Sequence, residues 1–240
     1  MPKISVVIPT LNEEKYLKFT LESFKKQTFT DFELVISDGG SKDKTLEIAK
    51  KYGAETIVVP HSNICLAREA GLKMGRGEII VCADADTFYP ENHLEEVAYE
   101  FKKDNHVVAV SGKAKLVNAP KWATFIWDLI YRTIEIVYKL TGIIIYVNAF
   151  NLAYKRKVFL ELGGYNTKLD WGGDELDVLA RIKKRGKIIY NSQLLPLTDG
   201  RRYNINFFTF LFKHLLYYYW LNYILAKIFG KSVISAKPVR

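Results

Sequence analysis

The sequence has little cysteine, and this scarcity bears on where the protein works and what it binds. Only Cys65 and Cys82 occur in 240 residues, both within apolar runs, and they form no recognisable metal-binding or redox pattern. We therefore expect two reduced thiols in the core of a cytosolic protein. No signal-peptide pattern precedes the first strand-like stretch, which agrees with that location.

Two common nucleotide-binding signatures are missing as well. The first apolar stretch, residues 4–8, is not followed by a G-x-G-x-x-G run, and the sequence contains no P-loop. The dinucleotide-binding fingerprint and the P-loop class of nucleotide-binding proteins are therefore excluded at the level of motifs.

Acidic residues are absent from Gly200 to Arg240, so the charge of the chain is distributed unevenly. The seven lysines and arginines of this segment supply +7 of the formal net charge of +9. Eleven aromatic residues lie from Tyr203 to Phe229, and tyrosine and tryptophan favour the headgroup level of a bilayer. Apolar residues dominate the segment too strongly for a nucleic-acid partner, so an anionic membrane surface is the expected partner.

We accordingly predict that residues 201–240 form a basic aromatic tail that attaches the protein peripherally to the cytoplasmic face of the membrane. In this prediction the tail is an amphipathic helical extension lying in the interface. A transmembrane helix and a buried core helix are the alternatives, because residues 207–229 are long enough to span a bilayer although polar residues interrupt them.

Strand and helix patterns alternate along the first hundred residues. Hydrophobic residues make up 49% of the whole sequence and charged residues 25%, as in a globular protein. The patterns predict strands at 4–8, 32–36, 56–59 and 78–82, and helices at 13–27, 44–52 and 64–74. This alternation predicts an α/β fold with a mainly parallel central sheet and helices on both faces.

The first predicted helix has a polar residue at its start and an apolar face. Asn12 is the expected N-cap. The side chains expected on the apolar face are Tyr16, Leu17, Leu21 and Phe24.

The second half of the chain is less regular. The patterns predict strands at 107–110 and 143–154 and helices at 121–140 and 174–184. In residues 121–140 the charged side chains fall into one narrow stripe, and nearly everything else is apolar or aromatic. A helix that is apolar around most of its circumference is expected to be buried or to lie in a membrane.

Three polar clusters follow predicted strands, and in parallel sheets ligands bind beyond the carboxyl ends of strands. The clusters are Thr10–Glu13, Asp38–Ser41 and Asp84–Asp86. The carboxylates of Asp84 and Asp86 are hard oxygen ligands that suit Mg²⁺ or Mn²⁺ together with a substrate diphosphate. A solvated turn is the alternative for that pair, and an Asx-turn with an N-cap is the alternative for Asp38.

A fourth acidic cluster opens the helix predicted at 174–184. Asp174 and Glu175 follow two glycines and are candidates for a general base that deprotonates an acceptor hydroxyl. Acidic residues are also favoured in a first helical turn by the helix dipole, so ordinary capping is the alternative.

Seven motifs stand in an order that is much rarer than any one of them. They are Val6–Glu14, Val35–Thr45, Leu66–Gly71, Cys82–Asp86, Asn148–Arg156, Gly163–Tyr165 and Gly173–Asp177. Together, over roughly residues 3–200, they resemble glycosyltransferase family 2, the inverting enzymes with a GT-A fold. One position departs from the family pattern, because the usual Glu-Asp pair is exchanged to Asp174-Glu175 here.

The resemblance implies a role for each motif residue that matches. It implies a nucleoside site formed by Pro9, Thr10, Glu13, Asp38 and Arg68, with Asp84 near the ribose or the cation. It implies a Mg²⁺ or Mn²⁺ site at Asp84 and Asp86, and a catalytic base at Glu175 by position. Asp174 is the alternative, because the side chain of Glu175 is one methylene longer than that of the usual aspartate. Arg201 or Arg202 would bind the diphosphate, and a basic anchor at the membrane is the alternative for these two.

The implied reaction is a single displacement that moves a sugar from a UDP- or GDP-sugar to an acceptor with inversion. Because the tail is basic and aromatic, the expected acceptor is lipid-linked or a polyprenyl phosphate; an ionised phosphate would need no strong base. Residues 1–200 would form the catalytic domain, with about 1–115 on the nucleotide side and about 116–200 on the acceptor side. A sugar-phosphate nucleotidyltransferase and a non-catalytic nucleotide-sugar binding protein are the alternatives.

Overall fold

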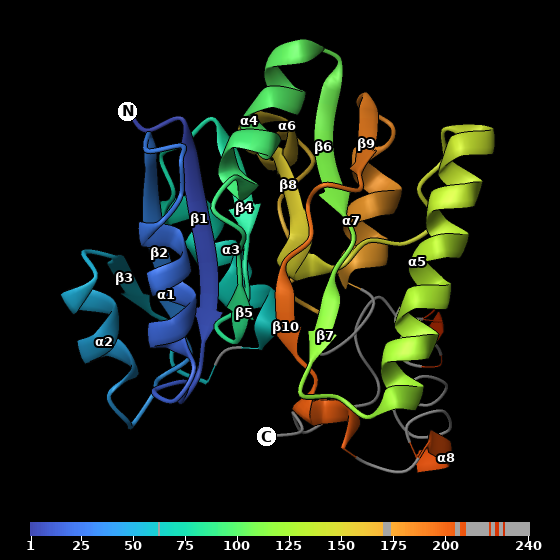
Figure 1. Ribbon diagram of the computed structural model, residues 1–240. Helices are drawn as coiled ribbons and strands as arrows, with labels where there is room; N and C mark the ends of the chain where they lie inside the picture. Colours follow the sequence, from blue (N-terminus) through green and yellow to red (C-terminus); the bar gives the residue numbers. More distant parts are fainter. Residues whose placement is uncertain are drawn as a thin grey trace.

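The computed structural model (Figure 1) describes residues 1–61, 63–169, 174–204 and 207–209, and positions 221, 224, 225 and 228. The strands are β1 (Ile4–Thr10), β2 (Phe32–Asp38), β3 (Glu55–Val58), β4 (Ile79–Cys82), β5 (Thr87–Phe88), β6 (Val107–Gly112), β7 (Lys115–Val117), β8 (Leu152–Lys155), β9 (Lys187–Asn191) and β10 (Leu197–Asp199). The α-helices are α1 (Leu17–Lys25), α2 (Thr45–Lys51), α3 (Ile64–Met74), α4 (His93–Lys103), α5 (Lys121–Thr141), α6 (Arg156–Glu161), α7 (Asp174–Ile182) and α8 (Phe207–Thr209). Two short 3₁₀ helices are η1 (Ala149–Asn151) and η2 (Arg201–Tyr203).

The central sheet has seven strands in the order β3-β2-β1-β4-β8-β6-β9. All neighbouring strands are parallel except at β8, which is antiparallel to both β4 and β6. Helices cover both faces (Figure 1). The predicted α/β fold with a mainly parallel sheet is therefore confirmed.

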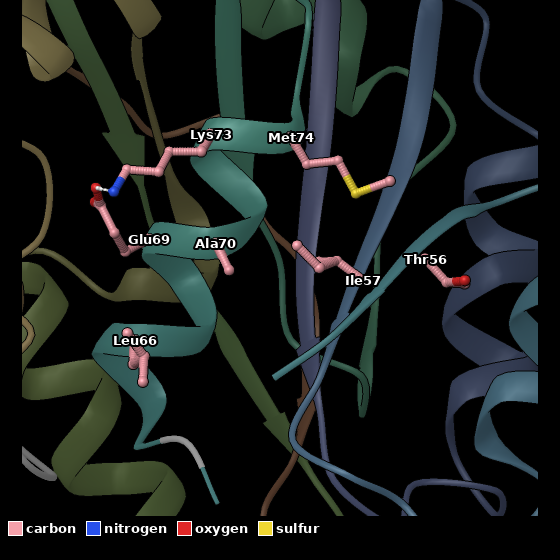
Figure 2. A pocket seen from close by; sticks show the side chains of 7 residues that line it. All are labelled: Thr56, Ile57, Leu66, Glu69, Ala70, Lys73 and Met74. Carbon is pink, nitrogen blue, oxygen red and sulfur yellow. Dashed lines mark ion pairs between the residues drawn. The ribbon is translucent and has the colours of Figure 1, made fainter. Parts of the chain in front are cut away.

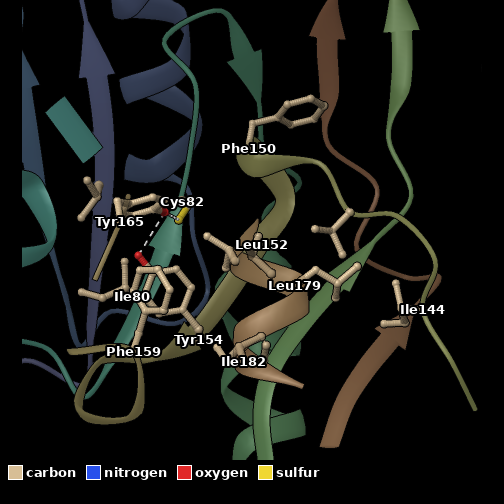
Figure 3. Close-up of a cluster of buried hydrophobic side chains, with 14 of the residues drawn as sticks. Ile80, Cys82, Ile144, Phe150, Leu152, Tyr154, Phe159, Tyr165, Leu179 and Ile182 are labelled. Carbon is tan, nitrogen blue, oxygen red and sulfur yellow. Dashed lines mark hydrogen bonds between the residues drawn. The ribbon is translucent and has the colours of Figure 1, made fainter. Parts of the chain in front are cut away.

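Alternation along the strands divides the core between the two faces. In β1, Ile4, Val6 and Ile8 join the apolar cluster that contains the buried side chains of α1 and α4. Val7 points the other way and joins the cluster under α3, α5, α6 and α7. Figure 3 shows part of this second cluster, in which a buried hydrogen bond joins Cys82 and Tyr165. Cys65 and Cys82 are buried and form no disulfide among the described residues, as expected for two reduced core thiols.

A second sheet of three strands, β5-β10-β7, was not predicted from the sequence. Its strands have two or three residues each, too few for a periodic signal. β5 starts directly after Asp86, and β10 ends directly before the turn that carries Arg201. This small sheet thus joins two segments that contain predicted site residues.

The prediction for the first helix is wrong at its start. α1 begins at Leu17, and the residue at its N-cap is Tyr16. Asn12 has a left-handed backbone with φ of 54°, so it cannot cap a helix that starts at residue 13. Its amide N–H donates to Ser41 Oγ (2.7 Å) and its Oδ1 accepts from Lys42 N–H (2.9 Å), so Asn12 connects two loops instead.

One further prediction differs from the structure. Residues 143–148 are irregular, 149–151 form η1, and only Leu152–Lys155 form a strand, because a strand at this place needs β4 and β6 as partners. Helix α5 is not fully buried, because Phe125 and Leu140 are 69% and 80% exposed, so the other option for this helix, a place in a membrane, stays a prediction. Among the described helices, none is long and apolar enough to cross a membrane. The predicted helical tail lies mostly outside the described residues.

Candidate active site

The turn after β4 carries the two aspartates predicted as metal ligands. Thr20 of α1 fixes this turn, because its Oγ1 donates to the carbonyl of Ala85 (2.7 Å) and accepts from Thr87 N–H (3.2 Å). The amide of Asp84 donates to the hydroxyl of the fully buried Tyr89 (3.2 Å). The Asp84 side chain is 25% exposed and that of Asp86 is 8% exposed. Both carboxylates are therefore held at the edge of the core.

Arg68 joins the aspartate turn to the acidic start of α7. Its Nη1 is hydrogen-bonded to Asp174 Oδ2, and its Nη2 lies 3.6 Å from Asp84 Oδ1. Burial alone would lower the pKa of Arg68, but the carboxylates of Asp174 and Asp84 hold it well above its usual value. Arg68 is therefore a permanent positive charge at the bottom of the site.

The close packing of α3 on the sheet places Arg68 there. A Cβ at Gly71, one turn further along α3, would lie 2.3 Å from Val7 Cγ1 in β1. Glycine at this position therefore lets the helix backbone approach the strand. The next residue after Arg68, Glu69, accepts the backbone N–H of Tyr165 (2.8 Å) and thereby holds the glycine turn before α7.

Arg201 joins the aspartate turn to the loop after β1. Its Nη2 lies 3.1 Å from Asp86 Oδ2 and 3.6 Å from Glu13 Oε2, and its guanidinium stacks on the Tyr16 ring at 3.9 Å. Its Nη1 is buried and has no hydrogen-bond partner among the described residues. The small sheet explains this placement, since Asp199 N–H donates to the carbonyl of Asp86 (3.2 Å).

Asp38 and Thr10 form the floor of the loop after β2. The buried carboxylate of Asp38 accepts the hydroxyls of Thr10 (2.9 Å) and Ser41 (2.5 Å) and the amides of Gly40 (2.9 Å) and Ser41 (2.7 Å). These four hydrogen bonds fit the Asx-turn that the sequence offers as the alternative role of Asp38. Pro9 lies in β1 next to Thr10, opposite Ser37 of β2. A nucleoside role for Asp38 stays a prediction.

Glu175 is the acid in this region that is least satisfied by the protein. Its Oε2 is buried and has no hydrogen-bond partner among the described residues. Burial raises the pKa of Glu175 well above its usual value, and the neighbouring charge of Asp174 raises it further, while Arg68 opposes both. Asp174, in contrast, is paired with Arg68.

The predicted site residues are thus brought together by two arginines. Arg68 bridges Asp84 and Asp174, while Arg201 bridges Asp86 and Glu13. The side chain of Arg202 lies outside the described part of the chain. The polar clusters that follow β1, β2 and β4 therefore lie in one region, and the individual binding roles stay predictions.

Sequence reasoning missed two aromatic residues of this region. Tyr16 was expected in the apolar face of α1 but lies under Arg201, while Leu17, Leu21 and Phe24 are buried as predicted. Tyr89 connects the Asp84 amide to the carbonyl of Phe150, to which its hydroxyl donates (2.9 Å). The sequence has no local signal for the role of Tyr16, because its partner Arg201 lies far away in the chain.

The donor set fits a cation that is shared with a substrate. Among the residues that the structure describes, no three acidic, histidine or cysteine side chains are grouped as a complete metal cage. Mg²⁺ commonly takes one or two carboxylates from the protein and the rest of its ligands from phosphates and water. Asp84 and Asp86 supply those two carboxylates, so the residues present suit a diphosphate-bound cation.

A groove of about 590 Å³ lies elsewhere, between α3 and the edge strand β3 (Figure 2). Its lining residues are Thr56, Ile57, Leu66, Glu69, Ala70, Lys73 and Met74. None of them is a predicted site residue, and Figure 2 shows Met74 extending from α3 towards the strands while Glu69 and Lys73 pair with each other. The groove is therefore separate from the candidate active site.

Residues 5–163 match the sequence model of Glycosyl transferase family 2. The match covers more than half of the chain, and the chain therefore belongs to glycosyltransferase family 2. It is a glycosyltransferase enzyme, as the order of its motifs predicts.

Curated relatives share part of the sequence. The glucosyl-dolichyl phosphate glucuronosyltransferase of Haloferax volcanii is 28% identical over 221 residues, covering 80% of this chain and 67% of that protein. The poly(ribitol-phosphate) beta-N-acetylglucosaminyltransferase TarP of Staphylococcus aureus is 35% identical over 121 residues, covering 47% of this chain and 37% of TarP. The chain thus spans about two thirds of the first relative and little more than a third of the second.

Solved structures share the fold. Staphylococcus aureus TarS residues 1–349 in complex with UDP has a TM-score of 0.68 at 23% identity, covering 82% of this chain and 60% of that chain. The mannosyltransferase PcManGT from Pyrobaculum calidifontis, in complex with GDP-Man and Mn²⁺, has a TM-score of 0.61 at 21% identity, covering 82% of this chain and 56% of that chain. The chain therefore has the GT-A fold that the resemblance implies.

Proposed function

We propose that this enzyme moves a sugar from a UDP- or GDP-sugar to a lipid-linked acceptor, with inversion and with Mg²⁺ or Mn²⁺. The observation that carries the proposal is the convergence of Asp84, Asp86, Arg68, Arg201 and the α7 acids beyond the central strands. Such a mixture of carboxylates and arginines suits a nucleoside diphosphate and its cation. The bound UDP of TarS and the bound GDP-Man and Mn²⁺ of PcManGT support this donor class.

On the donor side, the loops after β1 and β2 would hold the nucleoside. Pro9 and Thr10 end β1 and Glu13 follows in the loop, while Arg68 lies 3.6 Å from Asp84. Asp38 would bind the nucleoside only by exchanging one of its four internal hydrogen bonds.

The leaving diphosphate would lie between the aspartate turn and Arg201. Asp84 and Asp86 would hold a divalent cation, which when bound neutralises charge that develops on the leaving diphosphate. Arg201 Nη1 is buried and has no partner among the residues that the structure describes, so it can donate to a phosphate oxygen. Arg202 follows it in sequence and is the second candidate for this contact.

On the acceptor side, we assign the base to Glu175. Asp174 is held in the ion pair with Arg68, whereas the raised pKa of Glu175 brings it closer to the range in which a carboxylate takes a proton from a hydroxyl. Glu175 would accept the hydroxyl proton while the acceptor oxygen attacks the anomeric carbon and the bond to the diphosphate breaks. This division places the nucleotide side at about 1–115 and the acceptor side at about 116–200.

For the acceptor, the proposal favours a sugar hydroxyl on a polyprenyl-linked carrier. The relative from Haloferax volcanii is named for a glucosyl-dolichyl phosphate, and the basic aromatic tail is suited to a cytoplasmic membrane surface. A polyprenyl phosphate is the second candidate, and its ionised oxygen would need no base.

Replacing Glu175 tests this assignment. With a hydroxyl acceptor, Glu175→Gln should lower turnover by about two orders of magnitude or more while the affinity for the donor survives, because the proton has no acceptor. The initial rate of transfer and the donor Kd by calorimetry are the measurements. Unchanged turnover would show that Glu175 is not the base and would favour the phosphate acceptor.

Two product assays separate the alternatives. Release of pyrophosphate from a nucleoside triphosphate and a sugar phosphate would identify a nucleotidyltransferase. Failure to hydrolyse or transfer any donor in the presence of Mn²⁺, despite tight binding, would identify a non-catalytic binding protein. Release of UDP or GDP together with a glycosylated lipid is the outcome that the proposal expects.

A further inference from the structure

Helix α5 has an apolar face that points outwards. Phe125, Leu129, Ile136 and Leu140 are spaced by four, seven and four residues and therefore lie on one side of the helix. They are 69%, 54%, 58% and 80% exposed, respectively. We call these four residues the outer face of α5.

The opposite side of the same helix is already packed against the protein. Ala123, Tyr131 and Ile134 are at most 5% exposed and contribute to the core. Figure 1 shows α5 at the margin of the molecule, beyond the edge strand β9. The outer face is therefore not needed for the fold, and apolar side chains left in water cost free energy that a partner would recover.

Charged residues along this helix favour an anionic partner. Lys121, Arg132 and Lys139 are exposed beside the outer face, and Asp128 is the one exposed acid of α5. The other acid of the helix, Glu135, is engaged by Lys113 (2.7 Å) and Lys139 (2.9 Å). An apolar stripe with a basic border is typical of helices that lie in the headgroup region of a bilayer.

Exposed apolar residues continue beyond the helix. Ile143 and Ile145, directly after α5, are 59% and 48% exposed. Among the described positions of the tail, Leu221, Ile224 and Ile228 are 40%, 49% and 68% exposed, at the three- and four-residue spacing of one helix face. The tail also has no acid and several lysines, so its charge suits the same surface.

Two tryptophans connect α5 to the candidate active site. Trp127 Nε1 donates to the hydroxyl of Tyr203 (3.0 Å), and Trp122 contacts the Tyr203 ring edge-on at 6.3 Å. Tyr203 ends η2, the turn that begins with Arg201. A surface bound by α5 would therefore lie close to the arginine turn.

We propose that the outer face of α5 lies in the headgroup region of an anionic lipid bilayer and presents the site to lipid-linked acceptors. The docking itself does not depend on the proposed function. The purpose of the docking, access to an acceptor in the membrane, rests on that function. The basic border and the connection to Arg201 select a bilayer over a second copy of the chain, which would bring like charges together.

Vesicle flotation of the full chain tests the docking. Wild-type protein should float with phosphatidylcholine vesicles that contain phosphatidylglycerol and bind less to phosphatidylcholine alone. The triple variant Phe125→Ser, Leu129→Ser, Ile136→Ser should lower the partition coefficient by about tenfold or more, because three inserted side chains lose their apolar burial. Tyr99→Ser is the control: it removes a ring on α4 that is 54% exposed, as Leu129 is, and should bind like wild type.

Reversing the charge of Arg132 tests the electrostatic part of the docking independently. Arg132→Glu should lower binding to the anionic vesicles and leave the weak binding to neutral vesicles unchanged. Wild-type partition by the triple variant, or no binding by wild type, would overturn the proposal. A triple variant that changes only the oligomeric state in light scattering would also overturn it and identify a self-association face.

A solution assay keeps the two proposals separable. The triple variant should release UDP or GDP from the donor, with a detergent-dispersed acceptor, at the wild-type rate, since none of its residues contacts the site. If neither protein turns over any donor, the proposed function fails, while the flotation result still decides the docking.

Discussion

Arg68 and Asp174 form a buried ion pair, and the half-buried Glu175 lies next to it. Arg68 is 6% and Asp174 is 4% exposed, and the two are paired directly. Glu175 adjoins this pair, and its pKa is raised because of burial and the charge of Asp174. Neighbouring acids in the first turn of α7 therefore differ, because Asp174 is held in an ion pair and Glu175, which we propose as the base, is not.

Replacing the two acids by their amides should give different effects on stability. Asp174→Asn leaves the buried Arg68 without its nearest counter-charge and should lower the free energy of unfolding by about 3 kcal/mol. Glu175→Gln replaces a carboxyl whose raised pKa opposes ionisation and should leave the stability unchanged or increase it. Urea unfolding of both variants measures the difference. Equal stability of Asp174→Asn and wild type would mean that Asp84 alone balances Arg68.

His93 gives a prediction for pH. It is 2% exposed, packs edge-on against Tyr89, and burial lowers its pKa to about 3. Because the unfolded chain takes up a proton on this residue near pH 6.5, stability present above that pH should be lost as the pH falls, by about 1.4 kcal/mol per unit. His93→Leu should remove this slope between pH 6.5 and 5 in denaturant titrations. His106→Gln, which changes an exposed histidine, should keep it.

At the scale of elements, two contacts position the arginines of the site. The small sheet ties the aspartate turn to η2, with Thr198 paired to Thr87 and their hydroxyls 3.0 Å apart. The packing of α3 on β1 places Arg68. Neither arginine is positioned by its own segment alone, so both positions depend on distant parts of the sequence.

Adding one methyl group to α3 tests this dependence. In Gly71→Ala the new Cβ would meet Val7 Cγ1 at 2.3 Å, so the helix must shift and stability should fall by about 1–3 kcal/mol. Donor affinity should fall with it, since Arg68 moves with the helix. Adding Val7→Ala to the variant makes room and should restore part of both losses, as thermal denaturation and calorimetry would show. A Gly71→Ala protein with normal stability and affinity would contradict the tight packing.

The elements that the sequence predicts well are those with a local, repeated signal. The strands of residues 4–82 and α3 follow from apolar runs and helical spacing, and polar residues at their ends indicate where the site lies. Tyr16, the three short strands of the second sheet and residues 143–151 have no such signal. Their conformations depend on partners far away in the sequence, such as Arg201 for Tyr16 and Asp86 for β10.

For the whole molecule, the main asymmetry is one of charge. Residues 1–199 are close to neutral, and the acid-free segment from Gly200 to Arg240 supplies +7. Together with the outer face of α5, this segment would give the protein two membrane signals, and two weak signals combine to a much stronger attachment than either gives alone.

Truncating the tail tests the combination. Deletion of residues 204–240 removes five lysines and arginines and should release most of the protein from anionic vesicles, while donor binding by the remaining domain persists. Wild-type binding should also weaken as salt is raised, because the attraction is screened. Sedimentation with vesicles measures both effects. Unchanged sedimentation after the deletion would rule out the tail as a membrane signal.

The antiparallel strand β8 has a consequence for how the protein is made. It is inserted between β4 and β6, and its Leu152 pairs with Cys82, which is synthesised much earlier. Until residue 155 has left the ribosome, the exposed edges of β4 and β6 have no partner and are open to pairing with other chains. The two halves of the sheet are therefore joined by a strand that is synthesised after β4 and β6. Truncation before β8 should give an insoluble fragment rather than a small nucleotide-binding domain.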